Sequence, residues 1–341
     1  MGKSALVTGI TGQDGAYLAA LLLRKGYHVF GTYRQKSITG FWRLKELGLD
    51  RHDDITLLEH DITDFDNTVR ILQKYQPIEV YNLAAQSFVQ ASFGQPVMTA
   101  EVTGISVLKI LEAIRTVDKN IRFFQASTSE MFGKALAVPQ TETTPFVPKN
   151  PYGVAKVFAH WTTINHRETY GLFATSGILY NHESPLRGKE YVTRKITDAV
   201  ARIKLGTLDR LELGNLDARR DWGYAEDYVE GMWLMLQADE PDTFVLSTNK
   251  TTTVRSFVEM CFKAAGIDIS WKGEGLNEVG SDGIRDLIVI NPNFYRPTET
   301  ELLIGDASKA DKTLGWKSKT SVETLCSMMI QRDIERNDHR N

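Results

Sequence analysis

The sequence predicts an α/β protein with a doubly wound parallel sheet and a smaller C-terminal α/β lobe. Three observations carry this prediction. A glycine-punctuated turn joins an apolar strand to a helix at the N-terminus, strand and helix patterns then alternate to about residue 181, and the rhythm changes beyond it. At 341 residues the chain also exceeds what one hydrophobic core usually supports, so we expect two lobes.

Short apolar runs alternate with helical periodicity through the first half of the chain. The expected strands are 4–8, 27–33, 55–61, 79–85, 122–128 and 173–181. The expected helices are 14–25, 65–75, 100–116 and 153–170. Strands separated by helices form a parallel sheet that is covered on both faces.

A second lobe is expected after Asn181. Its expected elements are a basic segment at 192–206, a short strand at 210–215, a loop-rich stretch at 267–300 and an amphipathic helix at 321–336. A helix at 221–237 and a buried strand at 243–249 are expected to return to the first domain. We therefore assign residues 1–181, with about 221–249, to the first domain, and 182–220 and 250–341 to the lobe.

Composition narrows the partners and the compartment. Charged residues make up 24% of the chain and the formal net charge is -3, so no nucleic-acid-binding surface is implied. Two cysteines, Cys261 and Cys326, are too few for a disulfide framework. The N-terminus enters a strand without a secretory leader, and no apolar run is long enough to span a bilayer. We expect a cytoplasmic protein that binds neither nucleic acid nor membrane.

The turn after the first strand has the spacing of a dinucleotide site. Its glycines are Gly9, Gly12 and Gly15, directly before a helix, and the turn also contains Ile10, Thr11, Gln13 and Asp14. Glycines allow a tight turn and a close approach, so a pyrophosphate can sit on the N-terminus of the helix. Glycines are common in turns for structural reasons alone, but the strand–turn–helix context favours a Rossmann-type nucleotide site.

The end of the second strand favours NADP over NAD. It continues as Arg34, Gln35 and Lys36 without an acidic residue for the ribose hydroxyls, and Arg43 adds a further cation. A solvated basic loop is the alternative. The other expected cofactor contacts are Asp61 and Ile62 beside the adenine, and Leu83, Ala84, Ala85, Gln86 and Ser87 beneath the ribose and nicotinamide.

Four side chains form a candidate catalytic group. Tyr152 and Lys156 lie four residues apart at the start of a helix, so they share one face. We expect the ammonium to lower the phenol pKa so that Tyr152 can take a hydroxyl proton as hydride leaves the carbon, while Lys156 also binds the ribose. Thr128 offers a hydroxyl at the end of the preceding strand. Glu130 is surplus to a simple redox reaction but supplies the base that a dehydration needs; a plain helix N-terminal charge is the alternative.

These segments together resemble a known family. GITGQDG, NLAAQS, ASTSEMFG, PYGVAK, GILYNHESPLRG, VTRKIT, LGNLDARRDWGYAEDY and FYRPTE are similar to GDP-mannose 4,6-dehydratases, from Ala5 to about Met329. These enzymes belong to the extended short-chain dehydrogenase/reductase family. The resemblance implies conversion of GDP-D-mannose to GDP-4-keto-6-deoxy-D-mannose by an internal NADP hydride cycle with elimination of water. Tyr152 would deprotonate the C4 hydroxyl, and Glu130 would remove the C5 proton and assist loss of the C6 hydroxyl.

The resemblance also implies where the ligands lie. It places His182 and Arg187 near the cofactor. It also implies that residues 1–181 form the NADP-binding domain and that the lobe binds the GDP-sugar. The implied substrate contacts are Ser87, Thr128, Ser129, Asn181, Arg187, Lys195, Arg220, Arg296 and Glu299. Forked guanidinium groups suit a diphosphate, which agrees with Arg220 and Arg296.

Departures from the family pattern keep alternatives open. Residues 34–42 contain one Arg followed by Gln and Lys where relatives have an RRSS-type run that often reaches a neighbouring subunit, so the homo-oligomer is expected to be a dimer or a tetramer. Met98 and Phe88 stand where relatives often have Tyr and His. The substrate could therefore be another GDP-sugar such as GDP-manno-heptose. A GDP-4-keto-6-deoxy-sugar reductase or epimerase would need Tyr152 and Lys156 but not Glu130, and a non-catalytic NADP-sensing protein would usually have lost that pair.

Overall fold

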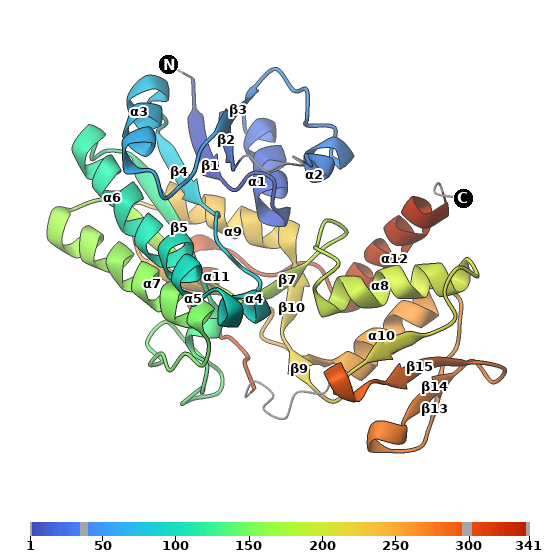
Figure 1. The fold of residues 1–341 in the computed structure, drawn as a ribbon. Coiled ribbons are helices and arrows are strands. Elements are labelled where there is room, and N and C mark those ends of the chain that lie inside the picture. Colours follow the sequence, from blue (N-terminus) through green and yellow to red (C-terminus); the bar gives the residue numbers. More distant parts are fainter. Residues whose placement is uncertain (1, 35–39, 295–301, 339–341) are drawn as a thin grey trace.

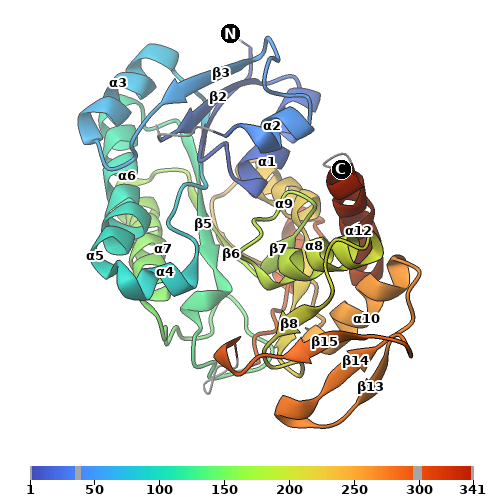
Figure 2. The same ribbon diagram turned by 45° about the vertical axis from the view of Figure 1, so that its right-hand side comes forward.

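The computed structural model describes residues 2–34, 40–294 and 302–338. Two bodies lie side by side (Figures 1 and 2): a large α/β domain and a smaller lobe formed from the C-terminal half of the chain. The large domain confirms the predicted fold class, a doubly wound parallel sheet with a smaller C-terminal lobe. Within the described residues, no helix is both long and apolar enough to cross a membrane.

A seven-stranded parallel sheet forms the centre of the large domain. Its spatial order is β11 (Thr243–Leu246), β6 (Ala174–Leu179), β5 (Arg122–Thr128), β4 (Glu79–Asn82), β1 (Ser4–Thr8), β2 (His28–Tyr33) and β3 (Ile55–Glu59). The chain order reverses between β1 and β4, which pair in parallel. In doubly wound sheets a ligand binds at the carboxyl ends of the strands beside such a reversal.

Helices cover both faces of the sheet (Figure 1). One face carries α1 (Gln13–Arg24), α9 (Ala225–Gln237) and α11 (Ser308–Leu314), and the other carries α3 (Phe65–Tyr75), α6 (Ser106–Val117) and α7 (Pro151–Tyr170). Shorter elements are α2 (Trp42–Glu46), α4 (Val89–Gly94), α5 (Pro96–Thr99), the π-helix η1 (Ala100–Ile105) and the 3₁₀ turn η2 (Ser129–Met131). The helix expected at 100–116 is thus a π-helical turn followed by an α-helix.

The lobe has its own sheet and its own apolar core. The sheet order is β13 (Ser270–Lys272), β14 (Val279–Ser281), β15 (Asp286–Ile290) and β8 (Leu211–Leu213). The helices are α8 (Val192–Lys204), α10 (Val254–Ala264) and α12 (Val322–Asp338), and the 3₁₀ turns are η3 (Gly275–Asn277) and η4 (Pro292–Phe294). Phe257, Phe262 and Met329 are among the side chains buried in this core.

Three antiparallel strands occupy a region where the sequence predicted loops. β13, β14 and β15 lie within 267–300, and the glycines that suggested loops sit at their turns and at one close contact. Gly273 and Gly283 have positive φ, whereas a side chain at Gly280 would meet the Cδ1 atom of Ile288 at 2.6 Å. The glycines in this region therefore belong to short hairpins and not to a long loop. The sequence did not predict the strands because each is too short to show an alternating pattern.

Two small pairings connect the bodies. β7 (Asn181–Glu183) pairs in parallel with β10 (Trp222–Tyr224), and β9 (Arg219–Arg220) pairs with β12 (Thr252–Thr253). The expected helix at 221–237 therefore begins only at Ala225, because its first residues form strand β10.

The returning segments are more extensive than the sequence predicted. The range assigned to the lobe, 250–341, contains Ala307, Ala310 and Trp316, which are buried in the core of the large domain. The indole Nε1 of Trp316 donates to the Asp227 carbonyl at 2.8 Å. Residues 307–316 thus belong with the large domain.

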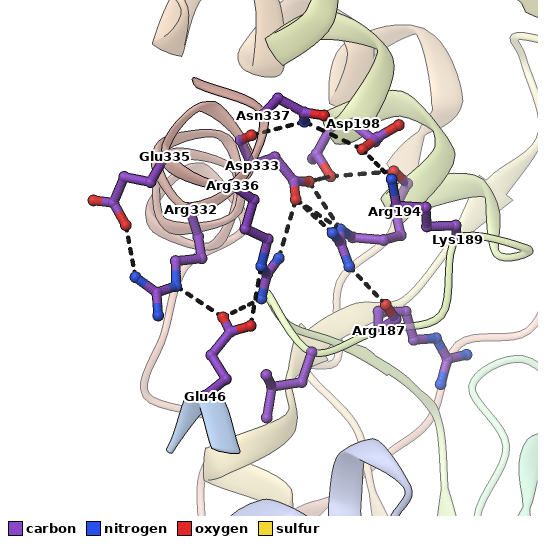
Figure 3. A network of polar contacts seen from close by, with 12 residues as sticks. Glu46, Arg187, Lys189, Arg194, Asp198, Arg332, Asp333, Glu335, Arg336 and Asn337 are labelled. Atoms are coloured by element: carbon purple, nitrogen blue, oxygen red, sulfur yellow. Dashed lines mark hydrogen bonds and ion pairs between the residues drawn. The ribbon is translucent and has the colours of Figure 1, made fainter. Parts of the chain in front are cut away.

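A buried ion cluster fixes helix α12 to the rest of the molecule (Figure 3). The Asp333 carboxylate has no exposed side-chain surface and accepts from Arg194 Nε at 2.8 Å and from Thr197 Oγ1 at 2.7 Å, both on α8. Arg336, one turn further along α12, donates to Asp333 at 3.0 Å and also pairs with Glu46 of α2. The Asp333 carboxylate therefore joins α8 to α12, and Arg336 joins α12 to α2 of the large domain.

We predict that Asp333→Ala lowers the free energy of unfolding by about 3–5 kcal/mol, because it leaves the buried Arg194 guanidinium without its carboxylate partner. Urea denaturation measures the change. Asp338→Ala, at the exposed end of the same helix, is the matched control and is expected to stay within about 0.5 kcal/mol. A loss below about 1 kcal/mol in Asp333→Ala would contradict the role given to the cluster.

Candidate active site

The glycine turn has the geometry that a pyrophosphate requires. Gly9 adopts a φ of +70°, which favours glycine, and a side chain on Gly15 would lie 2.4 Å from the Gly9 carbonyl oxygen. The N-cap of α1 is Gly12, which has no side chain to satisfy the first amides of the helix. Those amides and the helix dipole are therefore available to an anion.

The segment after β4 lies against this turn. The Thr8 hydroxyl donates to Asn82 Oδ1 at 2.8 Å and accepts from the amides of Leu83 and Ala84 at 3.1 Å each. A side chain on Gly9 would come within 3.0 Å of the Ala84 backbone. The two segments at the reversal of strand order are thus in direct contact, as the nucleotide-site prediction requires.

A partly buried ion pair joins the turn to strand β7. His182 Nδ1 donates to the Tyr180 carbonyl at 2.7 Å, and His182 Nε2 lies 2.9 Å from Asp14 Oδ2. Burial raises the pKa of Asp14, but the attraction and hydrogen bond of His182 outweigh it and lower the pKa to about 2. Burial lowers the pKa of His182, and Asp14 reverses this and raises it. Both ring nitrogens therefore donate, and His182 is an imidazolium.

The basic residues after β2 have separate positions. The pKa of Asp61 is lowered: burial raises it, but the hydrogen bonds from Thr63 and the charge of Arg34 outweigh burial. Arg34, which is exposed, therefore lies near Asp61. Arg43 instead binds protein carbonyls: its Nε donates to Leu186 at 2.7 Å and its guanidinium to Thr11 of the glycine turn at 3.1 Å. Lys36 lies outside the described residues.

Thr128 and Glu130 lie at the carboxyl end of β5. Thr128 is the N-cap of the 3₁₀ turn η2, and its Oγ1 accepts from the Glu130 amide at 3.3 Å. Glu130 Oε2 accepts from Asn150 Nδ2 at 2.9 Å. Ser129, between them, is buried, so Thr128 and Glu130 are the half-buried members of this turn.

Tyr152 and Lys156 lie on the first turns of α7. The Nζ of Lys156 lies 5.7 Å from the centre of the Tyr152 ring and donates to the Ala126 carbonyl at 2.6 Å. Burial lowers the pKa of Lys156 to about 8, with a smaller opposite effect of Asp14. Helix α7 thus places the pair beside β5, where Thr128 and Glu130 end the strand.

The pKa of Tyr152 is raised, whereas the sequence predicted that Lys156 would lower it. Burial is the largest cause, and the charges of Tyr191 and Glu130 act in the same direction. A hydrogen bond with Thr128 and the charge of Arg187 lower the pKa in part. In the protein alone Tyr152 is therefore a neutral phenol, and its deprotonation needs additional positive charge close to the ring.

Tyr191 is a site residue that the sequence analysis did not identify. Its hydroxyl lies 3.2 Å from Ser87 Oγ, its ring packs edge-on against Phe88, and the guanidinium of Arg187 lies 3.6 Å above the ring. Arg187 is also 3.1 Å from Glu183. A lone tyrosine before a basic helix gives no sequence signal, because its contacts come from distant segments.

The remaining expected substrate residues come from both bodies. Asn181 begins β7, next to His182; Lys195 lies on α8, with its Nζ 3.7 Å above the Phe294 ring; and Arg220 lies on β9. Burial lowers the pKa of Lys195, against an opposite effect of Glu212. Arg296 and Glu299 lie outside the described residues.

Fold and site together define a protein of the extended short-chain dehydrogenase/reductase type. The chain resembles a UDP-glucose 4-epimerase from Thermotoga maritima solved with UDP-glucose (TM-score 0.82, 25% identity, 98% of this chain and 99% of that one). It also resembles RMD from Pseudomonas aeruginosa complexed with NADPH (TM-score 0.77, 21% identity, 98% and 99%), a likeness of fold.

The sequence comparisons give the family. The model of the family described as GDP-mannose 4,6 dehydratase matches residues 6–329. A GDP-mannose 4,6-dehydratase from Sinorhizobium fredii (strain HH103) is 50% identical over 339 residues, which cover 97% of each chain. The chain belongs to the GDP-mannose 4,6-dehydratase family.

The Asp14–His182 pair makes stability depend on pH. The raised pKa of His182 stabilises the fold below about pH 6.5, and this contribution is lost as pH rises through the raised value. The lowered pKa of Asp14 stabilises it above about pH 4, and that contribution is lost as pH falls through about 2. We predict that Asp14→Asn lowers the melting temperature more at about pH 5.5 than at about pH 9.

Differential scanning fluorimetry at the two pH values measures this difference. Asp66→Asn, an exposed carboxylate in the first turn of α3, is the control and is expected to show no such difference. Equal losses at both pH values in Asp14→Asn would contradict the ion-pair assignment.

Proposed function

We propose that the protein converts GDP-D-mannose to GDP-4-keto-6-deoxy-D-mannose by eliminating water. The observation that carries the proposal is Glu130, a half-buried carboxylate two residues from Thr128 and close enough to Tyr152 to raise its pKa. A redox reaction alone needs no such base, whereas removal of a proton from the carbon next to a new carbonyl does. Family membership supports the same reaction.

We propose NADP as the resident cofactor. The close approach of Gly9, Gly15 and Ala84 and the uncapped start of α1 suit a pyrophosphate. Arg34 and the absence of an acid directly after β2 suit a 2′-phosphate, and Lys156 is proposed to bind the nicotinamide ribose. Arg187 Nε is paired with Glu183 Oε2 at 3.1 Å, and the charge of Arg187 acts on Tyr152, so a cation lies beside the proposed site.

Tyr152 takes the first proton in this proposal. Bound NADP supplies reversible hydride chemistry, so the hexose can lose hydride at C4 and regain it at C6. Tyr152 accepts the C4 hydroxyl proton, and Thr128 hydrogen-bonds the same oxygen. Burial raises the pKa of Tyr152 and Arg187 lowers it only in part, so the cationic ring of bound oxidised NADP would supply the additional positive charge that favours the phenolate.

Glu130 carries out the elimination. Its carboxylate takes the proton from C5, which the neighbouring C4 carbonyl has made acidic, and the C5–H electrons form the C5–C6 double bond as the C6 hydroxyl leaves. The same carboxyl gives its proton to the departing hydroxyl, so water is released. Hydride at C6 and a proton at C5 then complete the 6-deoxy sugar, and no net reductant is consumed.

The lobe is proposed to bind the GDP part of the substrate. Lys195 and Arg220 offer positive charge to the diphosphate, and Asn181, Ser87 and Ser129 are proposed as further substrate contacts, together with Arg296 and Glu299. Under this proposal the large domain, with its returning segments, is the NADP-binding domain. Two free buried thiols, Cys261 and Cys326, suit the reducing cytoplasm that we propose as the location.

We propose that the protein is a homo-oligomer, at least a dimer. Val154, Phe158 and Trp161 are exposed on one face of α7, and Val97 and Ile105 are exposed on α5 and η1, which pack against that helix. A second copy can cover such an apolar face, because a two-fold interface places the same patch on both sides and needs no complementary charge.

Glu130→Gln is predicted to reduce dehydration of GDP-mannose by at least about 10³-fold while NADP binding stays unchanged, because the amide cannot accept the C5 proton. Mass spectrometry of the product follows the loss of water, and fluorescence titration follows NADP binding. Glu101→Gln, on the exposed side of η1, is the control with full activity expected.

The wild-type assay separates the substrates. Purified protein is incubated with GDP-mannose and, separately, with GDP-manno-heptose, and the NADPH absorbance is recorded. We expect dehydration of GDP-mannose without net NADPH change. Dehydration of neither sugar, or full activity in Glu130→Gln, would overturn the proposed function.

Trp161→Glu is predicted to lower the mass of the assembly to that of a monomer, because it places a charge in the apolar contact. Size-exclusion chromatography with light scattering measures the mass. Leu276→Glu, an equally exposed apolar residue in the lobe, is the control and is expected to leave the mass unchanged. A monomeric wild type, or an unchanged mass in Trp161→Glu, would contradict the proposal.

A further inference from the structure

We propose that Asn150 is a positioning residue that sets the orientation of the Glu130 carboxylate relative to Tyr152. The inference rests on the proposed function of Glu130 as the base of a dehydration. It concerns a residue outside the set that the sequence predicted for the site. The two ends of the Asn150 amide bond different parts of the active site.

The acceptor end of Asn150 caps helix α7. Asn150 Oδ1 accepts from the Gly153 amide at 2.7 Å, and its extended backbone, at φ -142° and ψ 158°, has the conformation usual for an N-cap. Pro151 follows at the first helical position, where a missing N–H costs nothing. The cap therefore fixes the start of the helix that carries Tyr152.

The donor end of Asn150 binds the proposed base. Since Oδ1 faces the helix amide, Nδ2 must point the other way, and it donates to Glu130 Oε2 at 2.9 Å. The two requirements also fix the orientation of the amide, because a flipped side chain would place donor against donor at Gly153. Serine or aspartate could cap the helix as well, but neither can also donate a pair of N–H groups.

The backbone around this contact leaves little freedom. A side chain on Gly153 would lie 2.8 Å from the Glu130 carbonyl oxygen and 3.1 Å from Pro148 Cβ. The start of α7 and the Glu130 backbone are therefore in direct contact, and Asn150 bridges the remaining distance to the carboxylate. Its hydrogen bond holds Oε2 of the carboxylate, and we infer that Oε1 is the oxygen that takes the C5 proton.

Two substitutions separate the two roles of Asn150. Asn150→Ser keeps a capping oxygen but removes the donor to Glu130, and Asn150→Asp keeps the size and the cap but places a second carboxylate beside the first. We expect Asn150→Ser to lower kcat for GDP-mannose dehydration about three- to tenfold with unchanged KM. The acid limb of the pH–rate profile should move to higher pH, because a carboxylate that loses a donor binds its proton more tightly. Asn150→Asp should give the larger change in both.

Controls distinguish positioning from helix capping. The melting temperature and NADP affinity of Asn150→Ser should match the wild type, whereas Asn150→Ala loses the cap and should melt lower. Asn165→Ser, at an exposed position of α7, is the matched control. It removes an amide that donates to the Thr169 hydroxyl, and it should keep the wild-type kcat and pH profile.

Either of two outcomes overturns the proposal. One is wild-type kcat and pH profile in both Asn150→Ser and Asn150→Asp. The other is a loss of activity in Asn150→Ser that only follows lowered NADP affinity or stability. Failure of the proposed function is distinguishable, because it would appear in the wild type as no dehydration of GDP-mannose.

Discussion

The contact between the start of helix α7 and the end of strand β5 is the constraint on which the candidate active site depends. Lys156 Nζ binds the Ala126 carbonyl at 2.6 Å, and Gly153 leaves no room for a side chain against the Glu130 carbonyl. The helix supplies Tyr152 and the strand end supplies Thr128. The distance between Tyr152 and Thr128 is therefore set by backbone packing at Gly153 and by the hydrogen bond of the buried Lys156 to β5.

Burial at this junction opposes the charged forms of both Tyr152 and Lys156. Burial, together with the charges of Tyr191 and Glu130, raises the pKa of Tyr152 and keeps it a neutral phenol, whereas burial lowers the pKa of Lys156 to about 8. Arg187 is held by Glu183 and by the Tyr191 ring, and its carbonyl accepts from Arg194 of the ion cluster in Figure 3. Contacts from the ion cluster therefore reach the cation that lies beside Tyr152.

The sequence predicted those parts of the candidate site whose residues lie within one short segment of the chain. The glycine turn and the Tyr152/Lys156 pair each lie within one short segment, so spacing together with the surrounding strand and helix pattern predicted them as candidate site residues. Tyr191 and Asp333 act through residues more than 100 positions away, and no periodicity reports such contacts. The raised pKa of Tyr152 was missed for the same reason, since burial comes from the whole fold. The β13–β15 strands were missed because they are too short to show a period.

A single isotope experiment tests the internal hydride cycle that these residues are proposed to support. GDP-mannose carrying deuterium at C4 is converted by the purified protein in ordinary water, and the product is examined by NMR. The account predicts that the deuterium is found at C6 of the 4-keto-6-deoxy product, with no NADPH consumed. A product without deuterium at C6, or deuterium retained at C4, would contradict it.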